Sequence, residues 1–144
     1  MALVIHLKKG AQIIINGAVL ENVSGRALSL AIKNDAAILR GDDILAPDAA
    51  ATPASRIYYM LQCAYLFAER REEHLSAFSE LLTSYVHAAA SAEPIAGNVR
   101  AAIEAGNLYE ALKQARVLIQ HEGKVLNYVQ EQLREELRHG AAAR

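Results

Sequence analysis

The sequence of 144 residues has one cysteine, almost no excess of charge and no long apolar run. A single thiol, Cys63, can form no internal disulfide, and its apolar helical neighbourhood predicts a buried side chain. No segment approaches the about 20 uninterrupted apolar residues that a membrane span requires. No signal peptide is recognisable, because His6, Lys8 and Lys9 interrupt the first apolar residues. We therefore expect a cytoplasmic protein that does not span a membrane.

The charge balance restricts any contact with nucleic acid to a local patch. The formal net charge is −1, whereas most nucleic-acid binders carry a clear basic excess. As far as Asp48, five lysines and arginines stand against five acidic residues, so the N-terminal part is neutral as well.

The sequence also has no pattern typical of a catalytic or metal centre. Its glycines are dispersed singly, so no phosphate-binding loop is present. The five histidines follow neither HxxxH nor HxH spacing. The pair Asp42-Asp43 could hold a cation, but its place beside Gly41 at the end of a strand favours a turn or capping role. We predict no enzyme, no catalytic residues, no metal and no cofactor.

An Asn-Gly pair dominates the N-terminal part. Asn16-Gly17 lies between two apolar, β-branched runs, and both residues tolerate the positive φ that a two-residue type I′ hairpin requires. Further short apolar segments bounded by turn residues predict strands. They cover residues 3–7, 12–15, 18–21, 28–32 and 37–40. Short strands joined by tight turns predict a small antiparallel sandwich or barrel over residues 1–46.

Residues 52–139 read as a helical bundle, so the fold class is α+β. Thr52-Pro53 predicts a helix start, since Thr supplies an N-cap oxygen and Pro suits the first helical position. Further helices are expected from about Glu72, from Glu93 to about Ile103, and from Leu108 towards Arg138. Leucines and other apolar residues repeat in the last helix at near-heptad spacing, with Glu122 interrupting the seam.

The last helix contains Gly123, which costs about 1 kcal/mol relative to alanine inside a helix. The regular apolar pattern on both sides nevertheless favours one continuous helix. The seam of this helix, and a β module too small to bury both faces of a sheet, together predict a homo-oligomer.

Arg56, Tyr58 and Tyr59 form a dense group of recognition-type side chains at the start of the first helix. Arginine and tyrosine offer large contact areas with hydrogen-bonding tips, and they can stack on exposed RNA bases. In the competing interpretation, one tyrosine packs into the junction between the two parts and Arg56 pairs with an acid.

Several segments together resemble the flagellar-biosynthesis repressor FlbT family of alphaproteobacteria. They are residues 14–22 (IINGAVLEN), 37–40 (AILR), 52–59 (TPASRIYY), 108–113 (LYEALK) and 118–119 (LI). The resemblance covers nearly the whole chain. It implies a small cytoplasmic regulator that associates with the 5′ untranslated region of flagellin mRNA, usually repressing expression, with the small protein FlaF as a partner.

Within the β module, residues 10–15 and 38–44 are similar to the carbon storage regulator CsrA, a strand-rich homodimer that clamps mRNA. This similarity implies RNA-contacting roles for Leu3, Val4 and Arg40. The sequence departs from the CsrA pattern in the extra residue Gly41 and in its missing basic excess.

Two hypotheses remain open from the sequence. In the first, the protein regulates flagellin by contacting RNA or a partner through Leu3, Val4, Arg40, Arg56, Tyr58 and Tyr59. In the second, it is a protein-interaction adaptor that acts through FlaF or a flagellin chaperone complex without touching RNA.

Overall fold

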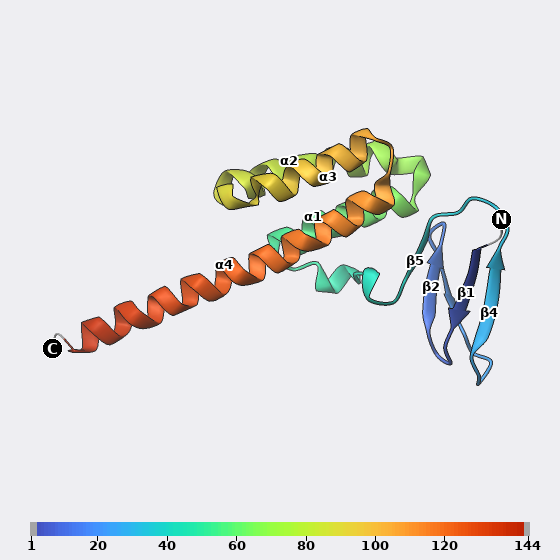
Figure 1. The fold of residues 1–144 in the computed structure, drawn as a ribbon, viewed down its shortest axis with the longest axis horizontal. Helices are drawn as coiled ribbons and strands as arrows, with labels where there is room; N and C mark the ends of the chain where they lie inside the picture. Colours follow the sequence, from blue (N-terminus) through green and yellow to red (C-terminus); the bar gives the residue numbers. More distant parts are fainter. Residues whose placement is uncertain (1–2, 143–144) are drawn as a thin grey trace.

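The computed structural model describes residues 3–142 and confirms the α+β order, with antiparallel strands first and helices after them (Figure 1). The strands are β1 (Leu3–Leu7), β2 (Gln12–Ile15), β3 (Ala18–Glu21), β4 (Leu28–Ile32) and β5 (Ile38–Arg40). Two short 3-10 turns follow, η1 (Gly41–Asp43) and η2 (Pro47–Ala49). The helices are α1 (Pro53–Leu66), α2 (Arg71–Ala88), α3 (Glu93–Glu104) and α4 (Leu108–Ala142), with η3 (Ala68–Arg70) and η4 (Ala90–Ala92) between them.

The strands form two small sheets that pack face to face. β1 pairs with β4, and the other sheet has the order β3-β2-β5, all antiparallel. Ile5, Leu7 and Ile13 fill the space between the two sheets. Because successive strand residues point to opposite faces, Ile14 and Leu39 face the other way and join the core of the helices. The sheet β3-β2-β5 is therefore a middle layer between β1-β4 and the bundle.

The predicted hairpin turn is confirmed. Asn16 has φ 51° and Gly17 φ 87°, and Ile15 pairs with Ala18 across the turn. Asn16 also ties the turn to the segment before β5. Its main-chain N–H donates to the Ala37 carbonyl, and its side-chain oxygen accepts from the Ala37 N–H, both at 2.8 Å.

The start of α1 is capped twice. Thr52 and Ser55 form a reciprocal capping box with Pro53 at the first helical position, which confirms the predicted helix start. A second cap comes from α4, where the buried carboxylate of Glu122 accepts a hydrogen bond of 2.8 Å from the Ala54 N–H. Glu122 interrupts the apolar seam of α4 because it satisfies a free N–H at the positive end of α1.

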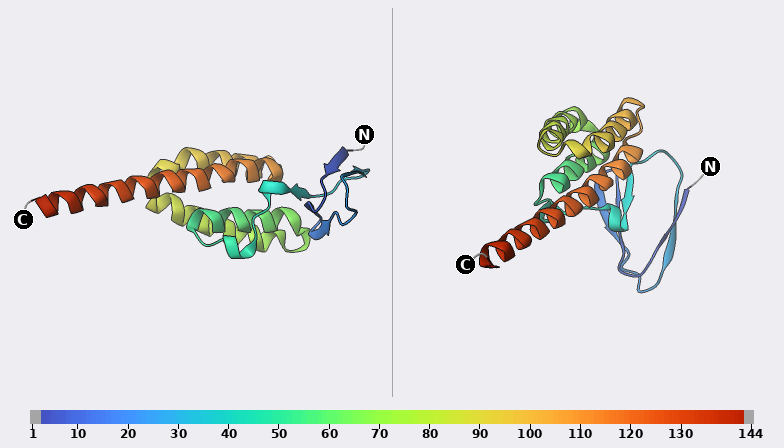
Figure 2. Two further views of the ribbon diagram at one scale, coloured as in Figure 1. Left: turned by 90° about the horizontal axis from the view of Figure 1, so that it is seen from below. Right: turned by 60° about the vertical axis from the view of Figure 1, so that its left-hand side comes forward.

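α4 runs unbroken through Gly123, as predicted, and it extends to Ala142, a few residues beyond the expected end. Its first half packs against α1 and α3. Its second half leaves the bundle, and residues 123–140 are all exposed (Figure 2). Across residues 3–142, no helix combines the length and the apolarity that crossing a membrane requires.

We predict that Gly17→Val destabilises the fold strongly. A valine resists the φ of 87°, and a Cβ at this position would lie 2.6 Å from the ring of Phe67. Strain of this kind costs about 1–3 kcal/mol. Urea unfolding of the variant should show this loss, and an unchanged midpoint would contradict the assignment of the turn.

Gly10 provides a matched control for this experiment. Its φ is 75°, but nothing lies within 4 Å of a Cβ placed there. Gly10→Val should therefore show the backbone cost alone, whereas Gly17→Val adds the collision with Phe67. Combining Gly17→Val with Phe67→Ala should recover that additional part and leave only the cost of the positive φ.

Candidate functional site

The segment from β5 to Leu45 is held on α1 by side chains that bond to its main chain. The Tyr65 hydroxyl accepts from the Ile38 N–H at 3.0 Å and donates to the Ile38 carbonyl at 3.1 Å. The Gln62 amide bonds the N–H and the carbonyl of Leu45 at 2.8 and 2.9 Å. The Tyr58 hydroxyl donates to the Asp43 carbonyl at 2.5 Å. These positions follow the helical repeat, so one face of α1 replaces a neighbouring strand.

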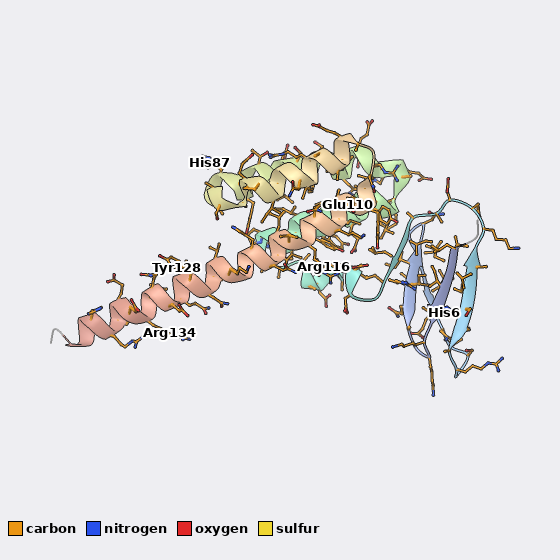
Figure 3. All side chains as sticks on the ribbon, in the orientation of Figure 1. His6, His87, Glu110, Arg116, Tyr128 and Arg134 are labelled. Carbon is orange, nitrogen blue, oxygen red and sulfur yellow. The ribbon has the colours of Figure 1, made fainter. Side chains whose placement is uncertain are left out.

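Arg116 on α4 also bonds to this segment, at Asp42 and Asp43 (Figure 3). Its guanidinium forms an ion pair of 2.6 Å with the Asp43 carboxylate and also donates to the Asp42 carbonyl. Gly41, Asp42 and Asp43 form the turn η1, so the turn interpretation of the acidic pair is confirmed. The carboxylate of Asp43 is engaged by an arginine.

A surface groove of about 720 Å³ lies beside the end of β5. Its lining brings together His6 and Lys8 from β1 and the turn after it, Gln12 from β2, and Arg40 from β5. Asp43 also borders the groove, but its charge is balanced by Arg116. Arg40 is exposed and belongs to none of the ion pairs among residues 3–142. The groove thus collects positive charge that the neutral composition of the chain conceals.

The other predicted site residues lie outside the lining of this groove. Leu3 and Val4 on β1 are 55% and 53% exposed. Arg56 is exposed on α1, and Tyr59 is partly covered, with its pKa raised by burial and by the neighbouring Cys63. Tyr58 is only 4% exposed, which leaves its ring no free face. Tyr58 packs into the junction, as the competing interpretation held, but Arg56 belongs to none of the ion pairs among residues 3–142, so the second part of that interpretation is wrong. Of the predicted site residues, Arg40 alone lines the groove.

Cys63 is buried as predicted, and burial raises the pKa of its thiol.

His121 lies between two hydroxyls, with Nδ1 at 2.9 Å from the Tyr85 hydroxyl and Nε2 at 2.8 Å from the Ser91 hydroxyl. In the described part of the chain, no three His, Cys, Asp or Glu side chains come close enough together to hold a metal ion.

Sequence reasoning missed Gln62, Tyr65 and Arg116, which position the site. It also missed three residues that line the groove, His6, Lys8 and Gln12. The helical spacing of Tyr58, Gln62 and Tyr65 was a usable signal, because polar-tipped side chains repeat there on one face of an otherwise apolar helix. Arg116 gave no such signal, since its partner Asp43 lies in a turn 73 residues earlier.

Comparison with known protein families identifies one that covers most of the chain. The model of the family described as flagellar protein FlbT matches residues 3–126, which include the β module, the groove and the bundle. The chain belongs to the FlbT family. The match ends shortly after Glu122, where α4 leaves the bundle.

Curated relatives of this FlbT-family protein carry regulatory names. The probable flagellum biosynthesis repressor protein FlbT 1 of Bradyrhizobium diazoefficiens is 38% identical over 87% of this chain and 85% of its own. The corresponding protein of Caulobacter sp. strain K31 is 32% identical over 90% of this chain and 99% of its own. No solved structure matches the fold significantly. The family supports a regulatory role in flagellum biosynthesis and gives no indication of catalysis.

We predict that Tyr58→Phe flattens the dependence of stability on alkaline pH. Burial raises the pKa of Tyr58 from 10.0 to about 12, and the nearby Asp43 carboxylate adds to the effect against the opposing Arg116. The neutral phenol is favoured in the folded state, so its contribution is complete below pH 10 and is lost as the pH rises towards 12. Wild-type protein should lose about 1–2 kcal/mol of stability through this group.

Denaturant unfolding at several pH values between 9 and about 12 measures this loss. The difference between wild type and Tyr58→Phe isolates Tyr58 from other titrating groups. The exposed Tyr128 on α4 gives the matched control, and Tyr128→Phe should follow the wild-type profile. Parallel profiles for wild type and Tyr58→Phe would contradict the assigned role of this hydroxyl.

Proposed function

We propose that this FlbT-family protein represses flagellin expression after transcription, by binding the 5′ untranslated region of flagellin mRNA through the groove beside Arg40. The observation that carries the proposal is the presence of Arg40, Lys8 and His6 in the lining of one open groove. RNA phosphates are bound mainly by arginine and lysine, and the affinity from such contacts does not require a basic protein overall. A local patch is what the net charge of −1 leaves possible.

The geometry around Arg40 supports this role. The main chain of β5 and η1 is bonded to Tyr65, Tyr58 and Arg116, so Arg40 starts from a fixed backbone. Its side chain remains exposed. Gln12 adds an amide that can read a base edge, although it bonds Glu21 at 3.2 Å in the free protein. Pre-positioned donors reduce the entropy lost on binding.

A second function is favoured by a different observation, the exposed apolar side chains of the β module. Leu3 and Val4 on β1, Val19 and Leu20 on β3, and Val23 after it are all more than 40% exposed. Five exposed apolar side chains on so small a module offer apolar area for a protein contact. They fit an adaptor that binds FlaF or a flagellin chaperone complex, with repression following from that contact.

The decisive test of the first function is binding of labelled flagellin leader RNA over a series of salt concentrations. Arg40→Ala should weaken binding and lower the salt slope by about one, as expected for the loss of one phosphate contact. Lys33→Ala removes an exposed positive charge outside the groove and should leave the slope unchanged. Arg56→Ala tests the α1 group, and a loss equal to that of Arg40→Ala would move the interface away from the groove.

Wild-type protein that shows no salt-sensitive binding to the leader would refute the RNA proposal. The adaptor proposal is tested in parallel with purified FlaF. Val4→Asp places a charge on the exposed outer side of β1 without touching the groove, and it should abolish co-purification with FlaF if β1 forms the contact. Retained co-purification would exclude this surface as the FlaF site.

A further inference from the structure

The part of α4 that extends beyond the bundle carries an unpartnered apolar stripe. We call residues 123–140 the distal segment; Figure 3 labels Tyr128 and Arg134 on it. Every residue in it is exposed. The stripe consists of Leu126, Val129, Leu133 and Leu137, which are 51%, 46%, 57% and 73% exposed. At 100° per residue, these positions fall within one narrow face of the helix.

The stripe continues the face of α4 that is buried within the bundle. Ala115, Ile119 and Glu122 lie on that face one to three turns earlier. α1 covers it in the antiparallel direction, with Tyr65 beside Tyr109 and the Ala54 N–H bonded to Glu122. α1 begins at Pro53, so its cover ends at the level of Glu122. The same apolar face then continues without a partner helix.

An isolated helix of this length is marginal in water, and most helical stability comes from packing an apolar face. We propose that a second copy of this chain covers the stripe, and that the two distal segments pair as an antiparallel two-helix coiled coil. The distal segment of the second copy then covers the stripe, as α1 covers the same face of α4 within the bundle.

The residue spacing is self-complementary in the antiparallel direction. The steps along the stripe are three, four and four residues. When one helix is reversed against itself, Leu126 lies level with Leu137 of the second copy. Val129 then lies within one residue of the level of Leu133. Each apolar layer therefore meets an apolar layer, as coiled-coil packing requires.

A parallel pair is excluded by the bundle. Two parallel helices in register would place residues 108–122 of the second copy alongside the same residues of the first. Residues 108–122 already pack against α1 and α3, so the face that the stripe continues is occupied at that level and cannot accept a second copy of α4. In the antiparallel pair the second bundle lies at the far end. The register that pairs Leu126 with Leu137 brings Glu122 of one copy level with the end of the other helix near Ala142.

Charges bordering the stripe permit this pairing. Arg134 borders the stripe on one side, and in the antiparallel register it faces Gln130 of the second copy. Lys124, Arg134 and Arg138 balance Glu131, Glu135 and Glu136 over the segment, so two copies do not repel each other. This neutrality also argues against a strongly charged partner as the occupant.

Light scattering of the full chain across micromolar concentrations tests the pairing. Wild-type protein should have a dimer mass, and Leu133→Asp should raise the dissociation constant about a hundredfold or more, because each dimer loses two buried leucines. Tyr128→Asp is the matched control, since Tyr128 lies on the opposite face and should leave the dimer intact. A wild-type monomer, or dissociation by both variants alike, would overturn the proposal.

Disulfide trapping tests the direction. In a Cys63→Ala background, Leu126→Cys and Leu137→Cys chains should each give little homodisulfide under mild oxidation, whereas their mixture should give the mixed disulfide. Homodisulfides that form as readily as the mixed one would overturn the antiparallel arrangement. Residues 123–140 are all exposed, so each substitution in the distal segment should keep the bundle unfolding midpoint of its parent protein, either wild type or Cys63→Ala, which circular dichroism verifies.

Discussion

The hydrogen bonds from one face of α1 to the main chain of residues 38–45 are the interaction on which the rest of the structure depends. β5 is an edge strand, and its outer N–H and carbonyl groups would lose water on packing against the bundle without gaining a partner. Tyr65 and Gln62 each satisfy a donor and an acceptor of this segment. A helix thereby closes the edge of a sheet, and no buried side-chain nitrogen or oxygen in the described residues is left without a partner.

Because α1 and α4 hold the segment after β5, the charge of the groove depends on both the β module and the helical bundle. Its basic residues come from the β module, but Arg116, which balances Asp43, comes from α4. Without Arg116, the carboxylate of Asp43 would border the groove unpaired and would offset the positive charge of Arg40. The similarity to CsrA at residues 38–44 is changed at the same point, because the extra Gly41, with φ 60°, starts the turn η1 that Arg116 and Tyr58 hold.

How much the sequence predicts depends on how local the controlling interactions are. The Asn16-Gly17 turn, the Thr52-Pro53 start of α1 and the continuity of α4 are set by neighbours in sequence, and all three were predicted. The similarity to CsrA over residues 38–44 also singles out Arg40, which the structure places exposed at the end of β5, while its contact with RNA stays a prediction. The pairs Asp43–Arg116 and Ala54–Glu122, separated by 73 and 68 residues, could not be found, because periodicity does not tell which helix faces which. For the same reason Tyr58 and Tyr59 were grouped, although the turn of the helix directs them to different surroundings.

The groove and the apolar stripe lie towards opposite ends of the molecule. The β module, which supplies the basic residues of the groove, is at one end, and the distal segment of α4 is at the other (Figure 1). Antiparallel pairing through α4 therefore leaves both grooves free and places them at the two outer ends of the dimer. A leader RNA long enough to reach both would bind the second groove as an intramolecular event, which raises affinity without new contacts. In the proposed dimer, two weak sites would act on one transcript, so a modest charge patch on a neutral protein would suffice for the proposed regulation.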